Sequence, residues 1–135
     1  MSLGNQAEVI SAEKKIRYHA AAVFASNLMV GLYDSAVELF TSCGLSSAFS
    51  EAALRSLFYG NAEKIAEHGA VAALSGPVER GDTETVEKHL EELEGDKRKI
   101  YLLLSKQLIG LAQRKNPNRD YTGIRTALEE AEQTE

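Results

Sequence analysis

The chain has 135 residues, of which 20 are acidic and 15 basic, and its formal net charge at pH 7 is -5. At this length we expect a single domain with a core of its own. The acidic balance and the lack of a basic stripe argue against a nucleic-acid partner, because phosphate contacts need clustered Lys and Arg side chains. Cys43 is the only cysteine, which excludes an intrachain disulfide and predicts a reducing, cytoplasmic location.

The most apolar stretch runs from Ala20 to Tyr33 and contains no charged residue and no proline. It predicts a helix that is apolar on nearly every side and that other helices must surround. The stretch is shorter than the roughly 20 residues of a bilayer span, and its extension meets Asp34 and Glu38. We therefore expect no membrane partner.

Periodicity predicts helices along the chain and no strand. The first is expected from near Ser11 or Ala12 to about Cys43, where Gly44 ends it. Ser50 is the expected N-cap of the second. One face of this second helix should be buried and consists of Leu54, Leu57, Phe58, Asn61 and Ile65.

Glycine and proline then mark a shaped turn from Ser75 to Asp82. Asp82 should cap a helix from Thr83 to about Leu93. The next helix, capped by Asp96, should end at Asn116-Pro117. Its expected apolar stripe comprises Ile100, Leu103, Leu104, Leu108, Leu111 and Ala112. A last amphipathic helix is expected over residues 121–133.

These elements predict an all-α fold in which four or more shorter helices pack around the long first helix. Met1 to Gly4 resembles a cloning remnant, since no basic region and apolar core follow it as in a signal peptide. We expect one helical domain over residues 5–135, because no repeat or linker separates a second one.

Polar residues within the apolar stretch are the first candidates for a site. His19, Ser26 and Tyr33 are spaced seven residues apart, which places them on one line of a helix with Asn27 beside it. Asn61 is a second unusual amide, because its face is expected to be buried. Either amide can instead be a structural hydrogen-bonding group between helices.

Motifs that identify an enzyme by spacing alone are absent from the sequence. It contains no dinucleotide fingerprint, no phosphate loop and no metal-site motif, and His19, His68 and His89 are too dispersed to form a cluster. Arg80 lies between two glycines just before a helix start, so it is either an anion-binding group or a surface arginine.

Two longer stretches carry a family resemblance: YHAAAVFASN over residues 18–27, and ALSGPVERGD over residues 73–82 with Thr85-Val86 and His89-Leu90 after it. From Ala12 to Leu111 the chain resembles the C-terminal helical domain of bacterial Rossmann-like NADP oxidoreductases of the coenzyme-deazaflavin-dependent type. That part is catalogued as a domain of unknown function. The resemblance implies a domain similar to the C-terminal domain of 6-phosphogluconate dehydrogenase.

In that superfamily an N-terminal Rossmann domain holds NAD or NADP, and the helical domain completes the substrate cleft and usually forms the dimer. The Rossmann half is missing here, so we expect an excised domain that is inactive alone and binds no cofactor. Related hydroxyacid dehydrogenases carry a catalytic lysine one turn before an asparagine. If Asn27 matches that asparagine, Val23 stands at the lysine position, and His19 becomes the catalytic candidate.

The sequence thus predicts the substrate-side and dimerisation domain of an NAD(P)-dependent oxidoreductase, with a small-molecule substrate, no metal and its own Rossmann domain as partner. The candidate substrate-binding residues are Tyr18, Ser26, Asn27, Asn61, Gly76, Pro77 and Arg80. The alternative is a non-catalytic helical interaction module whose polar residues fix helix packing. A substrate site would bring His19, Asn27 and the turn together in one cleft, and the alternative would leave them apart.

Overall fold

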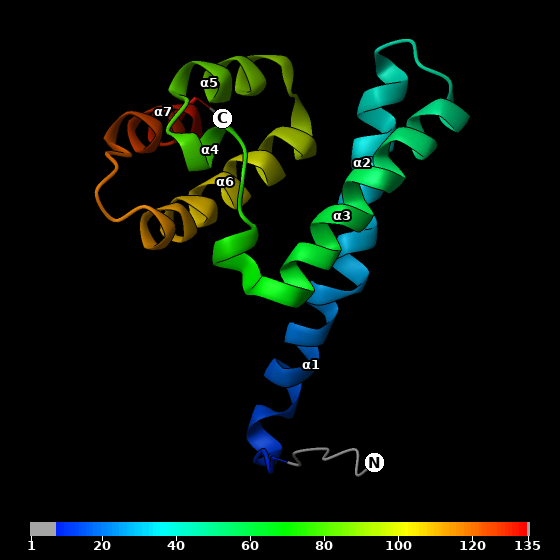
Figure 1. Ribbon diagram of the computed structural model, residues 1–135, viewed down its shortest axis with the longest axis vertical. Coiled ribbons are helices and arrows are strands. Elements are labelled where there is room, and N and C mark those ends of the chain that lie inside the picture. The colour runs from blue at the N-terminus through cyan, green and yellow to red at the C-terminus, as the bar shows by residue number, and fades with distance from the viewer. Residues whose placement is uncertain (1–7, 135) are drawn as a thin grey trace. The chain divides into compact units, whose positions relative to one another are not determined.

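The computed structural model describes residues 8–134, and every regular element in them is a helix (Figure 1). The predicted all-α class is confirmed. Contacts divide the chain into two compact units, Met1–Arg55 and Ser56–Glu135, called here the N-terminal and the C-terminal unit. The expected single domain stays a prediction.

The N-terminal unit is built from the apolar stretch. It contains a 3-10 turn at Ala12–Lys14, α1 at Lys15–Ala25, α2 at Asn27–Ser42 and the start of α3, which spans Ser47–Ala73. No residue of α1 or α2 is buried. The described residues therefore do not surround this stretch as its composition led us to expect.

The expected single first helix is divided at Ser26, whose backbone angles are φ -128° and ψ -81°. Its N–H donates to Val23 O (3.3 Å), three residues back, and its hydroxyl donates to Ala22 O (2.6 Å). Serine hydroxyls compete in this way with the backbone for a carbonyl one turn earlier. The side chain thus satisfies a carbonyl that the break releases from the helical ladder.

Only Ser50 and Leu54 are buried among the described residues of the N-terminal unit. The expectation that Ser50 caps α3 is wrong. The helix begins at Ser47, and Ser46 Oγ accepts the Phe49 N–H (3.2 Å), so Ser46 is the capping residue. The three serines near this start offer similar caps, and the chain uses the one that directly follows the turn.

One helical stretch, Ala12–Ser42, is long and apolar enough to cross a membrane by length and composition, and none of its most apolar window is buried. The core helix of a soluble protein and a signal sequence pass the same test, so this is weak evidence. The expected lack of a membrane partner stays a prediction.

The C-terminal unit has a packed core. Its helices after α3 are α4 at Pro77–Arg80, α5 at Thr83–Glu92, α6 at Gly95–Lys115 and α7 at Thr122–Gln133. The buried cluster consists of Val78, Val86, Leu90, Leu102, Ile109, Ala112, Tyr121, Ile124 and Leu128. Every one of these four helices contributes to it. The helices predicted over residues 83–93 and 121–133 are confirmed, and so is the end of α6 at Asn116.

The predicted apolar stripe of α6 is only partly the buried face. Of its residues, Ala112 is buried and Leu108 and Leu111 are half-buried, whereas Ile100, Leu103 and Leu104 are exposed. The other buried residues of the helix, Leu102, Ser105 and Ile109, lie outside the predicted stripe. The helix also begins at Gly95, so Asp96 lies in its first turn instead of capping it. Apolar residues occur on two sides of α6, and periodicity alone does not say which side the core occupies.

Ser50 generates a stability prediction. Its hydroxyl is fully buried and bonds to no other described residue, and a stranded buried hydroxyl costs about 1 to 3 kcal/mol. We expect Ser50→Ala to leave unfolding free energy unchanged or raise it by about 1 kcal/mol, and Ser46→Ala to lower it by about 1 kcal/mol. Urea unfolding followed by circular dichroism measures both. A loss of more than about 1 kcal/mol in Ser50→Ala would show that the hydroxyl has a partner.

Candidate functional site

The candidates of α1 are accessible. Tyr18 is 66% exposed, and the His19 side chain is also exposed. Neither forms a side-chain hydrogen bond with another described residue. His19 is therefore not an imidazole held within helix packing in this unit, and its ring is free to meet a ligand or a partner chain.

Ser26 and Asn27 are brought together at the helix break. Ser26 Oγ lies 2.6 Å from Ala22 O and 3.0 Å from Asn27 Oδ1. A hydroxyl carries one proton, so it donates fully to only one of these oxygens; turning the Asn27 amide would let its NH2 group donate to Ser26 instead. The hydroxyl therefore has a local role at the break, while the exposed Asn27 amide keeps capacity for further bonds.

Asn61 lies in α3 and is exposed, as are Leu57, Phe58 and Ile65 on the same face. Of the face expected to be buried, only Leu54 is buried. No hydrogen bond joins the Asn61 amide to another described residue. It is therefore not a structural bridge between helices within the described chain.

The Gly76–Asp82 turn is a rigid feature of the C-terminal unit. Gly76 has φ 103°, a conformation that glycine tolerates best, and Pro77 begins the short α4. Gly81 ends α4 in the left-handed region (φ 73°). The Arg80 side chain is 58% exposed, and its Nη2 lies 3.7 Å from Asp82 Oδ2. Arg80 is therefore presented to solvent from a fixed backbone.

Asp82 caps α5, as the sequence predicted. Its Oδ1 accepts the Thr85 N–H (3.1 Å), and its Oδ2 accepts the Thr85 hydroxyl (2.8 Å). These bonds hold the pKa of the Asp82 carboxyl below its ordinary value of 3.8, and the Arg80 charge acts in the same direction. The contacts of the turn therefore favour the ionised form of Asp82.

A polar cluster that sequence reasoning missed holds the turn from behind. Asn116 Nδ2 donates to Glu79 Oε1 (2.8 Å), and Arg119 Nη1 donates to Glu79 O (2.8 Å). The Tyr121 hydroxyl also donates to Glu79 O (2.6 Å). These partners lie about forty positions away in the chain, so no short motif could indicate them. They tie α4 to the segment between α6 and α7, and Arg80 is the next residue along.

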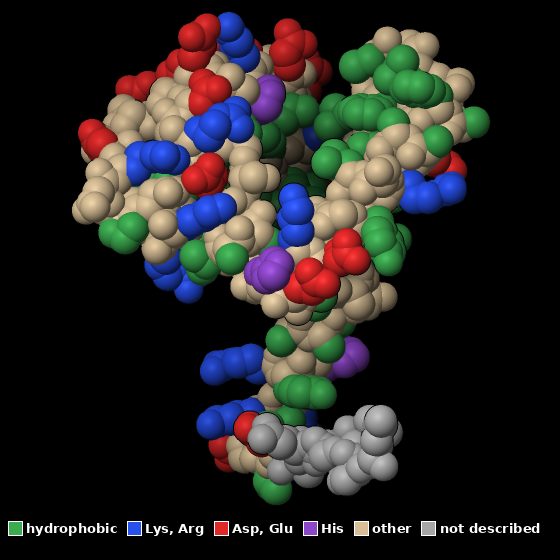
Figure 2. All heavy atoms as spheres, viewed as in Figure 1, with side chains coloured by type: hydrophobic (Ala, Val, Ile, Leu, Met, Phe, Trp, Pro, Cys, Tyr) green, Lys and Arg blue, Asp and Glu red, His purple; other side chains and the backbone are tan. Residues whose placement is uncertain are grey.

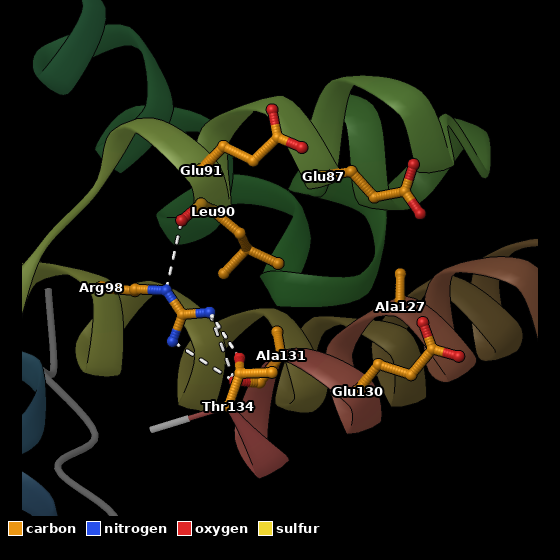
Figure 3. A pocket seen from close by; sticks show the side chains of 8 residues that line it. All are labelled: Glu87, Leu90, Glu91, Arg98, Ala127, Glu130, Ala131 and Thr134. Carbon is orange, nitrogen blue, oxygen red and sulfur yellow. Dashed lines mark hydrogen bonds between the residues drawn. The ribbon is translucent and has the colours of Figure 1, made fainter.

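A hollow with a volume of about 280 Å3 lies between α5, α6 and α7 (Figure 3). It is lined by Glu87, Leu90, Glu91, Arg98, Ala127, Glu130, Ala131 and Thr134. Arg98 Nε donates to Leu90 O (3.2 Å) and its terminal nitrogens to Ala131 O (3.3 Å), so the guanidinium ties α6 to both neighbours. None of the predicted site residues lines this hollow.

The predicted residues are divided between the two units. Tyr18, His19, Ser26 and Asn27 belong to the N-terminal unit, and Asn61, Gly76, Pro77 and Arg80 to the C-terminal unit. The structure brings Ser26 to Asn27 and joins Gly76, Pro77 and Arg80 in one turn. A single cleft formed by both groups stays a prediction. Within residues 8–134 no three His, Cys, Asp or Glu side chains gather as a metal site would require.

A protein-family model matches residues 1–108 of the chain. The chain belongs to the family described as Domain of unknown function (DUF2520). The match includes both stretches of the family resemblance and ends within α6, so α7 lies outside it. Curated proteins and solved structures give no match. Membership in DUF2520 therefore identifies the domain without assigning it an activity.

The Asp82 cap predicts a specific pH dependence. Because its folded pKa lies below the unfolded value, its contribution to stability is present above that unfolded value and is lost as the pH falls through the folded pKa. Asparagine can cap a helix but carries no charge. We therefore expect Asp82→Asn to melt below the wild type at pH 6 and the gap to close by about pH 2.

Differential scanning calorimetry between pH 2 and pH 6 measures this gap. Asp120→Asn is a matched variant, because Asp120 accepts the Thr122 N–H (2.9 Å) and its carboxyl pKa is likewise lowered by Thr122. The gap should close in the same direction for both variants. A gap that widens as the pH falls would show that the Asp82 carboxylate does not stabilise the fold.

Proposed function

We propose that this DUF2520 chain is the substrate-side and dimerisation domain of an NAD(P)-dependent oxidoreductase whose cofactor is held by a Rossmann domain elsewhere in the parent protein. The observation that carries the proposal is the exposed apolar surface of α1 and α2. A helix pair of this composition without a core requires cover from another chain or domain. The all-α class and the family match over both resemblance stretches agree with it.

Accessible polar groups support a role at a substrate. The His19 ring is exposed on α1, and Asn27 presents an amide one turn beyond Val23. In the proposed enzyme His19 exchanges a proton with the substrate, and Asn27 orients it by hydrogen bonding. Arg80, presented by the rigid Gly76–Asp82 turn, supplies a charge that fits an anionic group of the substrate.

The cofactor itself does not fit the described residues. A dinucleotide pyrophosphate binds at a glycine-rich turn between a strand and a helix, and residues 8–134 contain no strand. No step involving the nicotinamide is therefore assigned to this chain. Its part is to bind and orient the substrate and to exchange protons with it.

The helical interaction module is the second candidate, and the Ser26–Asn27 contact favours it. The Ser26 hydroxyl donates to the Ala22 carbonyl at the helix break. One of the predicted site residues therefore has a structural role. If Asn27 serves the same break, both residues shape α1 and α2 for packing. The two candidate functions therefore predict different effects of removing these side chains: a loss of turnover for the oxidoreductase domain, and a loss of stability for the interaction module.

A pair of alanine variants separates these functions. His19 is exposed and makes no side-chain hydrogen bond with a described residue. We therefore expect His19→Ala to change the free energy of unfolding by less than about 0.5 kcal/mol. In a full-length parent protein that carries the proposed Rossmann domain, we expect the same change to lower turnover about 100-fold or more. Asn27→Ala should lower turnover as well.

Thermal melts of the chain and NAD(P)H-linked turnover of the full-length protein, screened over small carbonyl and hydroxyl substrates, give the two readouts. Glu63→Ala is a suitable control, since Glu63 is exposed on α3 and belongs to neither candidate group. Variants that lose stability and keep full activity would reject the catalytic assignment and favour the interaction module.

Cofactor binding gives a further prediction. Calorimetric titration of the isolated chain with NADPH or NADH should show no saturable binding, because the proposal places the pyrophosphate site in a separate Rossmann domain. The full-length parent, titrated in parallel, should bind one of them. Micromolar affinity in the isolated chain would contradict the assignment of the cofactor to a separate Rossmann domain.

A further inference from the structure

The helix α3 is interrupted near its end by a single glycine. Gly69 has φ 80° and ψ 169°, which kinks the helix between two helical segments. Glycine adopts such a conformation readily, whereas other residues are strained in it. Figure 1 shows the ribbon of α3 changing direction near its C-terminal end. Residues 56–68 are called here the arm, and residues 70–74 the foot.

The foot is fixed to the core of the C-terminal unit. Ala73 is buried, and Leu74 packs against the buried cluster. The Lys115 ammonium, at the end of α6, donates to Leu74 O (2.6 Å) and to Ala72 O (3.2 Å). These bonds satisfy carbonyl groups at the end of α3, where helical partners run out. The backbone that follows Gly69 therefore belongs to the packed core.

The arm has no such anchor. None of residues 56–68 is buried, and none of them belongs to the buried cluster. Its large apolar side chains are exposed, namely Leu57, Phe58, Tyr59 and Ile65. Figure 2 shows hydrophobic side chains at the surface in the region of α2 and α3. The backbone that precedes the kink therefore lies outside the packed core.

Close packing does not explain the glycine at position 69. A Cβ atom added at Gly69 would meet nothing within 4 Å, whereas one added at Gly123 would lie 3.0 Å from Thr83 Oγ1. A neighbouring side chain therefore restricts position 123 to a small residue. At Gly69 the restriction comes from the backbone conformation alone.

We propose that Gly69 is a hinge, about which the arm turns as one helix relative to the foot and to the core helices α4 to α7. A strained backbone conformation persists in one form where the surrounding contacts determine it. Here contacts fix only the side that follows Gly69. Hinge motions are absorbed by a few backbone angles at the ends of elements, and Gly69 supplies such angles. The inference does not depend on the proposed oxidoreductase role.

The alternative is a fixed kink, in which the glycine gives the arm one direction. Both accounts need glycine at position 69, because both use its positive φ. They differ in the spread of positions that the arm occupies. A hinge predicts a broad spread, and a fixed kink predicts a narrow one.

Pulsed electron–electron double resonance measures this spread. Cys43→Ser removes the only cysteine. Ser56→Cys and Thr126→Cys then place one spin label at the far end of the arm and one on α7, both at exposed positions. Lys99→Cys with Thr126→Cys is the reference pair, because both of its labels lie on core helices. Dilution with unlabelled chain suppresses signals between copies. We expect a broader distance distribution for the arm pair than for the reference pair.

Two matched glycine variants locate the motion. Gly69→Ala removes the conformation that the hinge uses, so we expect a narrower distribution. Ser56 lies about 20 Å from Gly69 along the helix, so the mean distance should also shift by about 5 Å or more. Gly60→Ala makes the same change within the arm, at a glycine without positive φ and with nothing within 4 Å of an added Cβ. It should leave the distribution unchanged.

The results distinguish the two accounts. An arm pair as narrow as the reference pair, before any glycine is changed, shows a fixed kink and overturns the hinge. A Gly69→Ala distribution that keeps its mean and its width, or equal effects of Gly60→Ala and Gly69→Ala, also overturns it. Circular dichroism checks that both variants keep their helices. If Gly69→Ala loses them, the comparison of the arm pair with the reference pair decides.

Discussion

The structure depends on one constraint: α1 and α2 carry the most apolar sequence in the chain, and the described residues give them no core. Among residues 8–55, only Ser50 and Leu54 are buried. Burial of a large apolar side chain contributes about 1.5 to 3 kcal/mol, and helices of this length are marginal in water without tertiary packing. We therefore propose that contacts outside their own unit stabilise these two helices.

The C-terminal unit has the opposite character, because its four helices after α3 close around one apolar cluster. Its polar contacts concentrate where that cluster meets the Gly76–Asp82 turn. Asn116, Arg119 and Tyr121 donate hydrogen bonds to Glu79. Asp82 accepts one from the Thr85 N–H at the start of α5. The turn therefore holds the backbone of Arg80 in place, whereas α1 and α2 expose apolar side chains, which we propose another chain or domain covers.

Much of the fold follows from local signals in the sequence. The Asp82 cap and the end of α6 at Asn116 depend on neighbouring residues, and the structure contains both. The stretch from Ser75 to Asp82, which was expected to be a turn, also contains the short helix α4 from Pro77. The break at Ser26 is also local, but serine within an apolar helix is usually tolerated, so its presence alone did not indicate a break. Several serines near the start of α3 could cap it, so the sequence alone did not single out Ser46.

The sequence did not predict which long-range contacts form. Apolar residues lie on two sides of α6, and which side meets α5 and α7 depends on helices elsewhere in the chain. The Glu79 cluster joins residues that no spacing rule connects. Of the candidate site, the sequence placed Gly76, Pro77 and Arg80 in one turn correctly, but the local pairing of Ser26 with the Ala22 carbonyl depends on backbone geometry that composition does not reveal.

Hydrogen exchange of the α1 and α2 amides at several protein concentrations tests the central claim most directly. If these helices depend on a second chain, their protection should rise with concentration while that of α5, α6 and α7 stays constant. Strong protection of α1 and α2 that does not change between about 1 and 100 μM, in a chain that stays monomeric, would contradict the account, because a single chain would then stabilise them unaided.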